Sequence, residues 1–180
     1  MSGKPEFSRP YRIDALSGSP RRVEIGADPE EREALARRFG LISIERLSAE
    51  ASLSRSGEAV TAEGRLRGAV TQSCVAMSEP VPAEVEEPFR IEFRPQQEAA
   101  GGQEEIELSE GELDVVFYEG GAIDLGEAVA ETLSLSLDPY PRSPSSEEAL
   151  RQAGVKSEEQ AKIEASPFAA LKGLGERLQR

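Results

Sequence analysis

The chain has 180 residues and carries 21 Lys or Arg against 34 Asp or Glu, which gives a formal net charge of −13. It contains no His, no Trp and one Cys. Without His there is no Ser-His-Asp or Cys-His nucleophile system and no His-ligated metal. A single Cys supplies neither an internal disulfide nor a four-thiolate zinc site. We therefore expect no cofactor and no bound metal.

The length fits one ordinary domain, but a hydrophobic fraction of 38% is low for a chain that packs throughout. No stretch approaches the roughly 20 apolar residues of a membrane span. The first residues also lack the apolar core of a signal peptide. A lone thiol suits a reducing compartment. We expect a cytoplasmic protein that does not associate with membranes.

The acidic charge is concentrated in one segment, residues 96–140, which holds 12 acidic side chains and no Lys or Arg. Such a block favours a basic partner and disfavours broad contact with a phosphate backbone. The alternative is a solvated acidic face that only keeps the protein soluble. The candidate partner-binding residues of this segment are Glu104, Glu105, Glu107, Glu112, Asp114 and Glu119.

The first clear element is a helix over residues 29–39. Asp28 is suited to cap it, Pro29 suits the first helical position, and Glu31 completes a capping box. Gly40 is the expected stop.

Strand patterns follow from residue 42 to residue 93. A change of apolar parity near Glu45-Arg46 predicts a bulge. The even residues from 60 to 70 are apolar or small and alternate with polar or charged ones, so Arg65 and Arg67 should project from the solvent-exposed face. Cys74 continues the inward parity, which favours a buried structural thiol. In 81–93 the odd residues face inward.

The acidic segment contains a further strand and a helix. Leu113, Val115 and Phe117 are expected to face the core. Asp124 and Glu127 form a second predicted capping box, before a leucine-rich helix that ends at Asp138-Pro139.

The last part of the chain is predicted to lie outside the core. Residues 142–165 are polar, with many Ser and Glu and few large apolar residues, and are expected to form a mobile linker. Residues 166–180 predict a terminal amphipathic helix, with Phe168 and Leu171 on its apolar stripe. This helix could dock on its own domain or on a partner.

These elements predict an α+β fold with one core domain over residues 1–141. Its centre is a curved antiparallel sheet, or a partly open barrel, of about five to six strands with two packed helices and a C-terminal tail helix.

Three segments, in this order and spacing, resemble the YceD family, named for accumulation of large-subunit ribosomal RNA. They are the hairpin from Gly64 to Phe93 with Gln72-Ser73-Cys74; Gly121-Ala122-Ile123-Asp124-Leu125 with a leucine-rich helix and Asp138-Pro139-Tyr140-Pro141; and Ser166-Pro167-Phe168-Ala169-Ala170-Leu171. The resemblance implies a cytoplasmic protein needed for normal large-subunit rRNA levels, often encoded beside a small basic ribosomal protein.

The sequence departs from the family at the hairpin. Many relatives carry a Cys-x-x-Cys pair there, whereas Met77 stands three residues after Cys74 in this chain. A thiolate metal site therefore lacks ligands, and we expect apolar packing of Cys74 and Met77 instead.

The favoured hypothesis is a non-enzymatic factor for large-subunit assembly that binds a basic ribosomal protein, or a pre-ribosomal particle, through the acidic segment. The alternative is direct rRNA binding by Arg65, Arg67, Arg21 and Arg22. A carboxylate-based hydrolase is the third hypothesis and has the least support, because helix capping explains Asp124 and Glu127. The sequence does not predict the oligomeric state.

Overall fold

The computed structural model describes residues 5–96 and 114–155. In chain order its elements are β1 (Pro10–Arg12), a short 3-10 helix (Ile13–Ala15), β2 (Arg21–Gly26), α1 (Pro29–Phe39), β3 (Ser43–Ser56), β4 (Ala59–Ser73), β5 (Pro80–Pro95), β6 (Asp114–Tyr118), β7 (Ala122–Asp124), α3 (Leu125–Ser136) and α4 (Ser146–Gln152).

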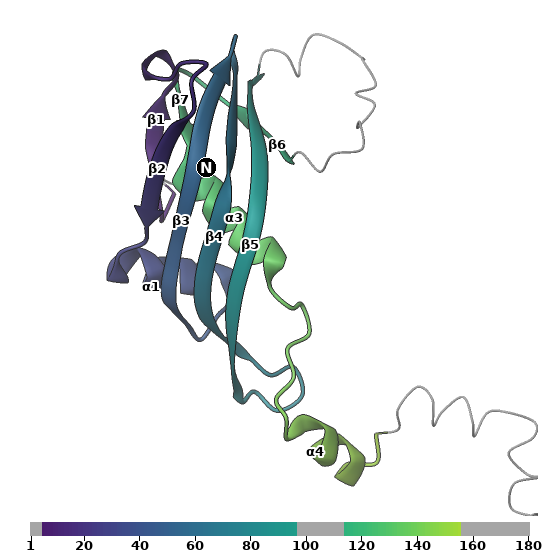
Figure 1. Cartoon of the computed structure of the whole chain (residues 1–180). Helices are drawn as coiled ribbons and strands as arrows, with labels where there is room; N and C mark the ends of the chain where they lie inside the picture. The colour runs from purple at the N-terminus through teal and green to yellow at the C-terminus, as the bar shows by residue number, and fades with distance from the viewer. Residues whose placement is uncertain (1–4, 97–113, 156–180) are drawn as a thin grey trace, which may run out of the picture.

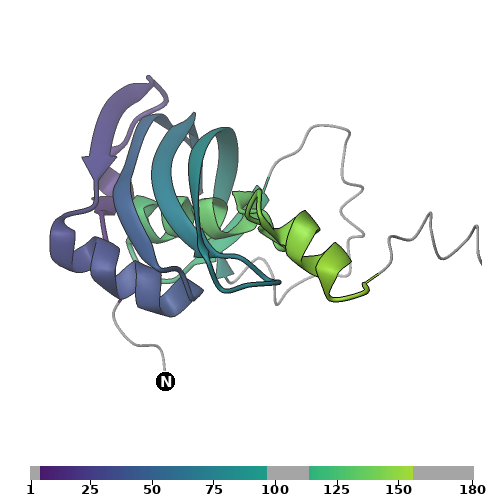
Figure 2. The ribbon, with the colours of Figure 1, turned by 90° about the horizontal axis from the view of Figure 1, so that it is seen from below.

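The main sheet has the strand order β2-β3-β4-β5-β6, and β1 pairs with β7 in a separate two-stranded sheet (Figure 1). The long strands β3, β4 and β5 are neighbours, and α3 lies across one face of the curved sheet (Figure 2). This is the predicted α+β fold with a curved sheet. The sheet is mixed rather than fully antiparallel, because β6 pairs with β5 in parallel.

The core lies between this sheet face and the two helices. As predicted, the even residues of β4 and the odd residues in the second half of β5 point inward, and Leu66 and Phe93 are fully buried. Leu35 of α1 and Leu133 of α3 are fully buried in the same cluster.

The start of α1 is the predicted capping box. The Asp28 carboxylate accepts from the Glu31 backbone N–H at 2.9 Å, and the Glu31 carboxylate accepts from the Asp28 backbone N–H at 2.9 Å. Gly40 ends the helix with φ = 67°, in the left-handed region that glycine adopts without strain.

The start of α3 only half matches its prediction. Asp124 caps the helix by accepting from the backbone N–H groups of Gly126 and Glu127 at 3.0 and 3.2 Å. Glu127 does not complete a box, because Arg38 of α1 pairs with its carboxylate at 2.7 Å. An ion-paired hydrogen bond of this kind is stronger than one from a neutral backbone N–H.

The structure tests two predictions about the strands, the bulge near Glu45-Arg46 and the inward-facing residues of β6. The register of β3 against β4 shifts between Ile44 and Arg46, which confirms the predicted bulge. The predicted facing of β6 is wrong: Val116 and Tyr118 pack against the core, while Phe117 is 46% exposed. The cause is the parallel register, which sets Val116 beside the inward-facing Phe93.

The part of β5 that no described strand covers is rich in proline. Among the described residues, β6 covers β5 only from Ile91 to Pro95. Along the uncovered part of β5 stand Pro80, Pro82 and Pro88. All three have the same parity, so their missing N–H donors lie on one side of the strand, away from β4.

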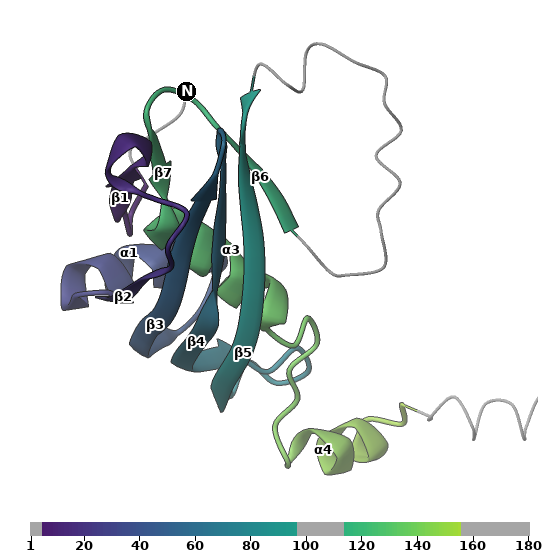
Figure 3. The ribbon, with the colours of Figure 1, turned by 45° about the horizontal axis from the view of Figure 1, so that its top comes forward.

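The start of the predicted linker is packed against the hairpin between β4 and β5. Ser143 and Ser146 are buried, and the Val75 N–H donates to the Pro141 carbonyl at 2.9 Å. The helix α4 then lies beyond the end of the sheet (Figure 3). Phe168 and Leu171 lie outside the described residues. The division at residue 141 stays a prediction.

Candidate functional site

The acidic segment is described only in its second half. Glu104, Glu105, Glu107 and Glu112 lie outside the described residues. Asp114, at the start of β6, and Glu119, after its end, are both exposed, as predicted for partner-binding side chains. Two of the six candidate acids, Asp114 and Glu119, therefore lie at the two ends of β6.

The outer face of the sheet carries a ladder of ion pairs instead of a free basic patch. Arg67 pairs with Glu50 at 2.7 Å and with Glu86 at 3.5 Å. Arg65 pairs with Glu86 at 3.2 Å. These side chains stand on three adjacent strands and are about half exposed. The positive charge of Arg65 and Arg67, two of the four predicted RNA-contacting arginines, is thus offset by acids on the same face.

The two N-terminal arginine candidates, Arg21 and Arg22, are consecutive residues of β2 and so point to opposite faces of the sheet. Arg22 shares the outer parity of Glu24 and lines a shallow hollow of about 470 Å³ together with Glu24, Glu50 and Glu63. Arg21 has the opposite parity, that of the inward-facing Ile25, and is exposed because it begins the strand. The four arginines therefore do not form one continuous basic surface.

Cys74 is buried, with 2% of its surface exposed, as predicted. The Ser143 backbone N–H donates to its Sγ at 3.3 Å, and hydrogen bonds to the sulfur, this one first, lower the pKa of the thiol from 9.0 to about 7. The expected packing with Met77 is wrong, because Met77 is 40% exposed. The turn that follows Cys74 carries Met77 outward, and Ser143 occupies the place beside the sulfur.

No metal centre is evident in the part of the chain that the structure describes. Within residues 5–96 and 114–155, no three Cys, Asp or Glu side chains are grouped so that they could hold an ion. None of the described helices is long and apolar enough to cross a membrane.

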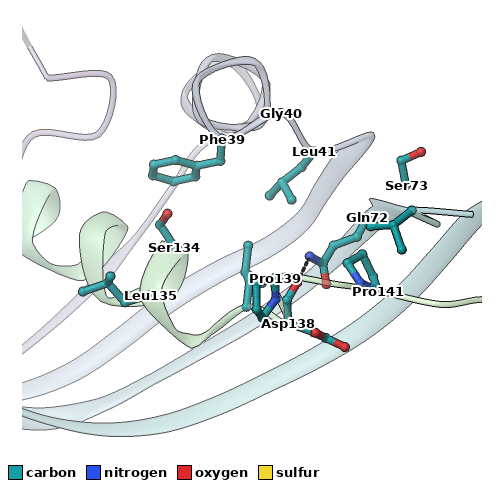
Figure 4. Close-up of a pocket in the computed structure, with 12 residues that line it drawn as sticks. Phe39, Gly40, Leu41, Gln72, Ser73, Ser134, Leu135, Asp138, Pro139 and Pro141 are labelled. Atoms are coloured by element: carbon teal, nitrogen blue, oxygen red, sulfur yellow. Dashed lines mark hydrogen bonds between the residues drawn. The ribbon is translucent and has the colours of Figure 1, made fainter. Parts of the chain in front are cut away.

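Sequence reasoning missed a groove at the end of the sheet, between the C-terminal ends of α1 and α3 (Figure 4). Its volume is about 510 Å³. The lining residues come from α1 and the turn after it, from the end of β4 and from the end of α3: Phe39, Gly40, Leu41, Gln72, Ser73, Val75, Ser134, Leu135, Leu137, Asp138, Pro139 and Pro141.

The groove is mainly apolar, and two of its polar side chains are already bonded to the chain itself. The Gln72 amide donates to the Asp138 carbonyl at 2.9 Å (Figure 4). The Asp138 carboxylate accepts from the Tyr140 backbone N–H at 2.8 Å. These bonds fix the chain that follows α3 against the end of β4.

Two lining residues of the groove, and Tyr140 next to it in the chain, have exposed apolar side chains. Leu135 is 84% exposed, Val75 is 55% exposed and Tyr140 is 71% exposed. The signal for Leu135 was present in the sequence, because the core stripe Leu125, Val129 and Leu133 leaves residue 135 on another side of the helix.

The family model that matches this chain is described as Large ribosomal RNA subunit accumulation protein YceD, and it matches residues 62–175. This range runs from β4 through α4 and onward, and it includes Cys74 and most of the groove. No curated protein and no solved structure matches the chain. The family description names the accumulation of an RNA and no chemical reaction. Because the match covers more than half of the residues, the chain belongs to the YceD family of large ribosomal RNA subunit accumulation proteins.

Proposed function

We propose that this protein supports large-subunit rRNA accumulation as a non-enzymatic cytoplasmic factor that binds a basic ribosomal protein, free or in a pre-ribosomal particle. The observation that carries the proposal is the segment 96–140, with 12 acidic residues and no basic one. A field of one sign attracts an oppositely charged partner and raises its association rate.

The described part of the segment supports this role. Asp114, Glu119 and Glu131 are exposed, and none of them has an ion-pair partner among the described residues. Glu127 is neutralised by Arg38, which belongs to another part of the chain. Three described acids of the segment, Asp114, Glu119 and Glu131, are therefore available to face a partner.

Direct rRNA binding, the alternative, has less support from the outer face. A phosphate approaching Arg65 or Arg67 meets Glu50 and Glu86, which lie 2.7 to 3.5 Å from these arginines. Binding would have to replace existing ion pairs while the displaced carboxylates remained nearby.

The test is to neutralise five acids of the segment together and to measure capture of purified basic large-subunit ribosomal proteins at low and moderate salt. The substitutions are Glu104→Gln, Glu105→Gln, Glu107→Gln, Glu112→Gln and Asp114→Asn. A control with the same charge change neutralises five exposed acids elsewhere: Glu24, Glu30, Glu58, Glu63 and Glu147.

We expect the segment variant to lose capture and the control variant to retain it, with unchanged melting temperatures. Capture by the wild type should fall as salt rises, because exposed charges are screened over about 10 Å at 0.1 M salt. If both variants lost capture equally, the binding would depend on the net charge of the whole protein and would contradict a specific role for the acidic segment. Unchanged capture in both would mean a solvated face, and Arg65→Gln with Arg67→Gln should then be tested against large-subunit rRNA.

A further inference from the structure

The strand β6 forms an edge of the main sheet that is well suited to pair with another strand. It is the last strand of the order β2-β3-β4-β5-β6, so one of its sides has no partner among the described strands (Figure 3). Its sequence, Asp-Val-Val-Phe-Tyr, favours an extended backbone and carries neither Pro nor Lys, the residues that commonly block an edge. By contrast, the uncovered part of β5 is interrupted by Pro80, Pro82 and Pro88.

The hairpin between β4 and β5 sets the direction of the backbone groups along β5. At its turn the Cys74 N–H donates to the Glu79 carbonyl at 2.8 Å, so this pair of residues bonds across the hairpin. Bonded and non-bonded pairs alternate along an antiparallel ladder, and the register of β4 with β5 is unbroken. The even residues of β5 therefore point their N–H and C=O groups away from β4, and at Glu92 and Arg94 β6 lies on that side.

The same geometry leaves two residues of β6 with outward backbone groups. In a parallel ladder, the backbone groups of a residue point at the two neighbours of its register partner. The partners of Glu92 and Arg94 are Val115 and Phe117, so β5 faces the backbone groups of residues 114, 116 and 118. The N–H and C=O groups of Val115 and Phe117 therefore point to the open side, where no described residue bonds to them.

The side chains along this open side are apolar in the middle and acidic at both ends. Phe117 is 46% exposed, and Val115, which has the same parity, is half-buried. Asp114 and Glu119 are exposed and have no ion pair within the described ranges. The register partner of Phe117 on β5, Arg94, is already paired with a glutamate of its own strand at 2.7 Å. A strand added here would gain from an apolar side chain beside Phe117 and from basic residues near its ends.

Charge selects a basic strand at this edge over a second copy of the chain. Two β6 strands that paired with each other would bring together two segments, residues 96–140 of each copy, that hold 12 acidic residues and no basic one. Charge also separates β6 from the opposite edge of the sheet. The strand β2 begins with Arg21 and Arg22, which repel a basic segment, and the Arg9 guanidinium donates to the Gly26 carbonyl at its end at 2.7 Å.

We propose that a basic, extended segment of a partner protein adds to β6 as a further strand of the main sheet. Its backbone bonds to the outward N–H and C=O groups of Val115 and Phe117, and one of its apolar side chains covers the Phe117 ring. Its Lys or Arg side chains lie near Asp114 and Glu119. Strand addition gives affinity through main-chain hydrogen bonds and specificity through alternate side chains. The inference rests on the proposed function, because it states how the basic partner binds the acidic segment.

The test is amide hydrogen exchange of the full chain, read by NMR at Val115 and Phe117, with and without a synthetic peptide of five Lys-Val repeats. A peptide of five Lys-Pro repeats has the same charge but lacks half of the N–H donors and cannot pair as a regular strand. Val115→Pro removes an outward N–H and keeps the bonds to β5, and Val115→Ala, which keeps the N–H, is the matched control. If Val115→Pro does not fold, Phe117→Pro and Phe117→Ala repeat the comparison.

We expect the Val115 and Phe117 amides to exchange rapidly in the free chain and at least about tenfold more slowly with the Lys-Val peptide bound. Val115→Pro should bind this peptide at least about fivefold more weakly than the wild type and Val115→Ala, because one backbone hydrogen bond is lost.

Slow exchange of both amides in the free chain would overturn the proposal, because the edge would already be covered, by a second copy if the protection disappears on dilution. No binding of the Lys-Val peptide, equal binding of the Lys-Pro peptide, or equal binding to Val115→Pro would also overturn strand addition. The proposed function would survive these results if capture of basic ribosomal proteins still depended on the five neutralised acids.

Discussion

Arg38, near the end of α1, holds Glu127, in the first turn of α3, through two hydrogen bonds of 2.7 and 3.0 Å. The same guanidinium donates to Glu6 at 2.9 Å. One side chain thus joins the N-terminal segment and the two helices that cover the sheet. The pKa of Arg38 is raised, first by its hydrogen bonds to Glu127.

Replacing Arg38 with Ala should lower the free energy of unfolding by about 1 kcal/mol, because a partly exposed, two-point ion pair is lost. Arg37→Ala is the control on the same helix: within the described part of the chain Arg37 pairs only with Glu33, and both side chains are about 70% exposed. Urea unfolding of the two variants measures the difference. Equal effects would contradict a special role for Arg38.

The pair between Arg9 and Glu31 should make stability depend on acid pH. The Arg9 guanidinium, 2.6 Å away, lowers the pKa of Glu31 below 4.5. A lowered pKa in the folded state stabilises the protein above pH 4.5, and this contribution is lost as pH falls through the folded-state value.

Glu31→Gln keeps an acceptor for the Asp28 N–H but removes the charge. The wild type should therefore be more stable than Glu31→Gln at pH 7, and the two should converge as pH falls below 4.5. Chemical unfolding across this range measures the gap. If the difference in stability between the wild type and Glu31→Gln did not change with pH, the loss would come from the geometry of the substituted side chain, and the negative charge of Glu31 would not contribute.

Gly126→Ala should destabilise the protein, although alanine normally favours a helix. A Cβ at residue 126 would lie 2.5 Å from the Phe7 carbonyl oxygen and 2.9 Å from the Arg9 nitrogen. We expect a loss of about 1 to 3 kcal/mol, as for other overpacked sites. Gly121→Ala, where a Cβ has nothing within 4 Å, is the control.

Cys74 should stabilise the fold more at alkaline pH. Its pKa falls from 9.0 to about 7, first because the Ser143 N–H donates to the sulfur. Between these values the unfolded chain holds the proton that the folded chain has released, so stability rises with pH. The difference in unfolding free energy between the wild type and Cys74→Ala should grow from pH 7 to pH 9. A pH-independent difference would exclude a thiolate in the folded state.

Elemental analysis of the purified protein should show no stoichiometric zinc. The chain has no His and one Cys, and the described residues contain no cluster of three possible ligands. One zinc per chain would mean that residues outside the described ranges complete a site around Cys74.

Local patterns predicted most of the central fold. The α1 helix has the predicted bounds because Asp28, Glu31 and Gly40 are signals that act within one or two turns. The alternation in β4 and β5 was equally reliable, since each strand has one buried face.

The failures involve partners that are distant in the chain. Which side chains of β6 face the core depends on its parallel register with β5, and this register cannot be read from the residues of β6 alone. The side chain of Glu127 bonds to Arg38, 89 residues away, in place of its own helix start. The groove likewise arises where three chain segments end together, so its residues are scattered in the sequence.

The three prolines along the free edge of β5 have a consequence for behaviour at high concentration. A strand edge with a full row of N–H donors is a template on which another chain can extend the sheet. Pro80, Pro82 and Pro88 remove donors from that row. Two molecules that meet along this part of β5 therefore find an interrupted row of donors, which disfavours extension of the sheet from this edge.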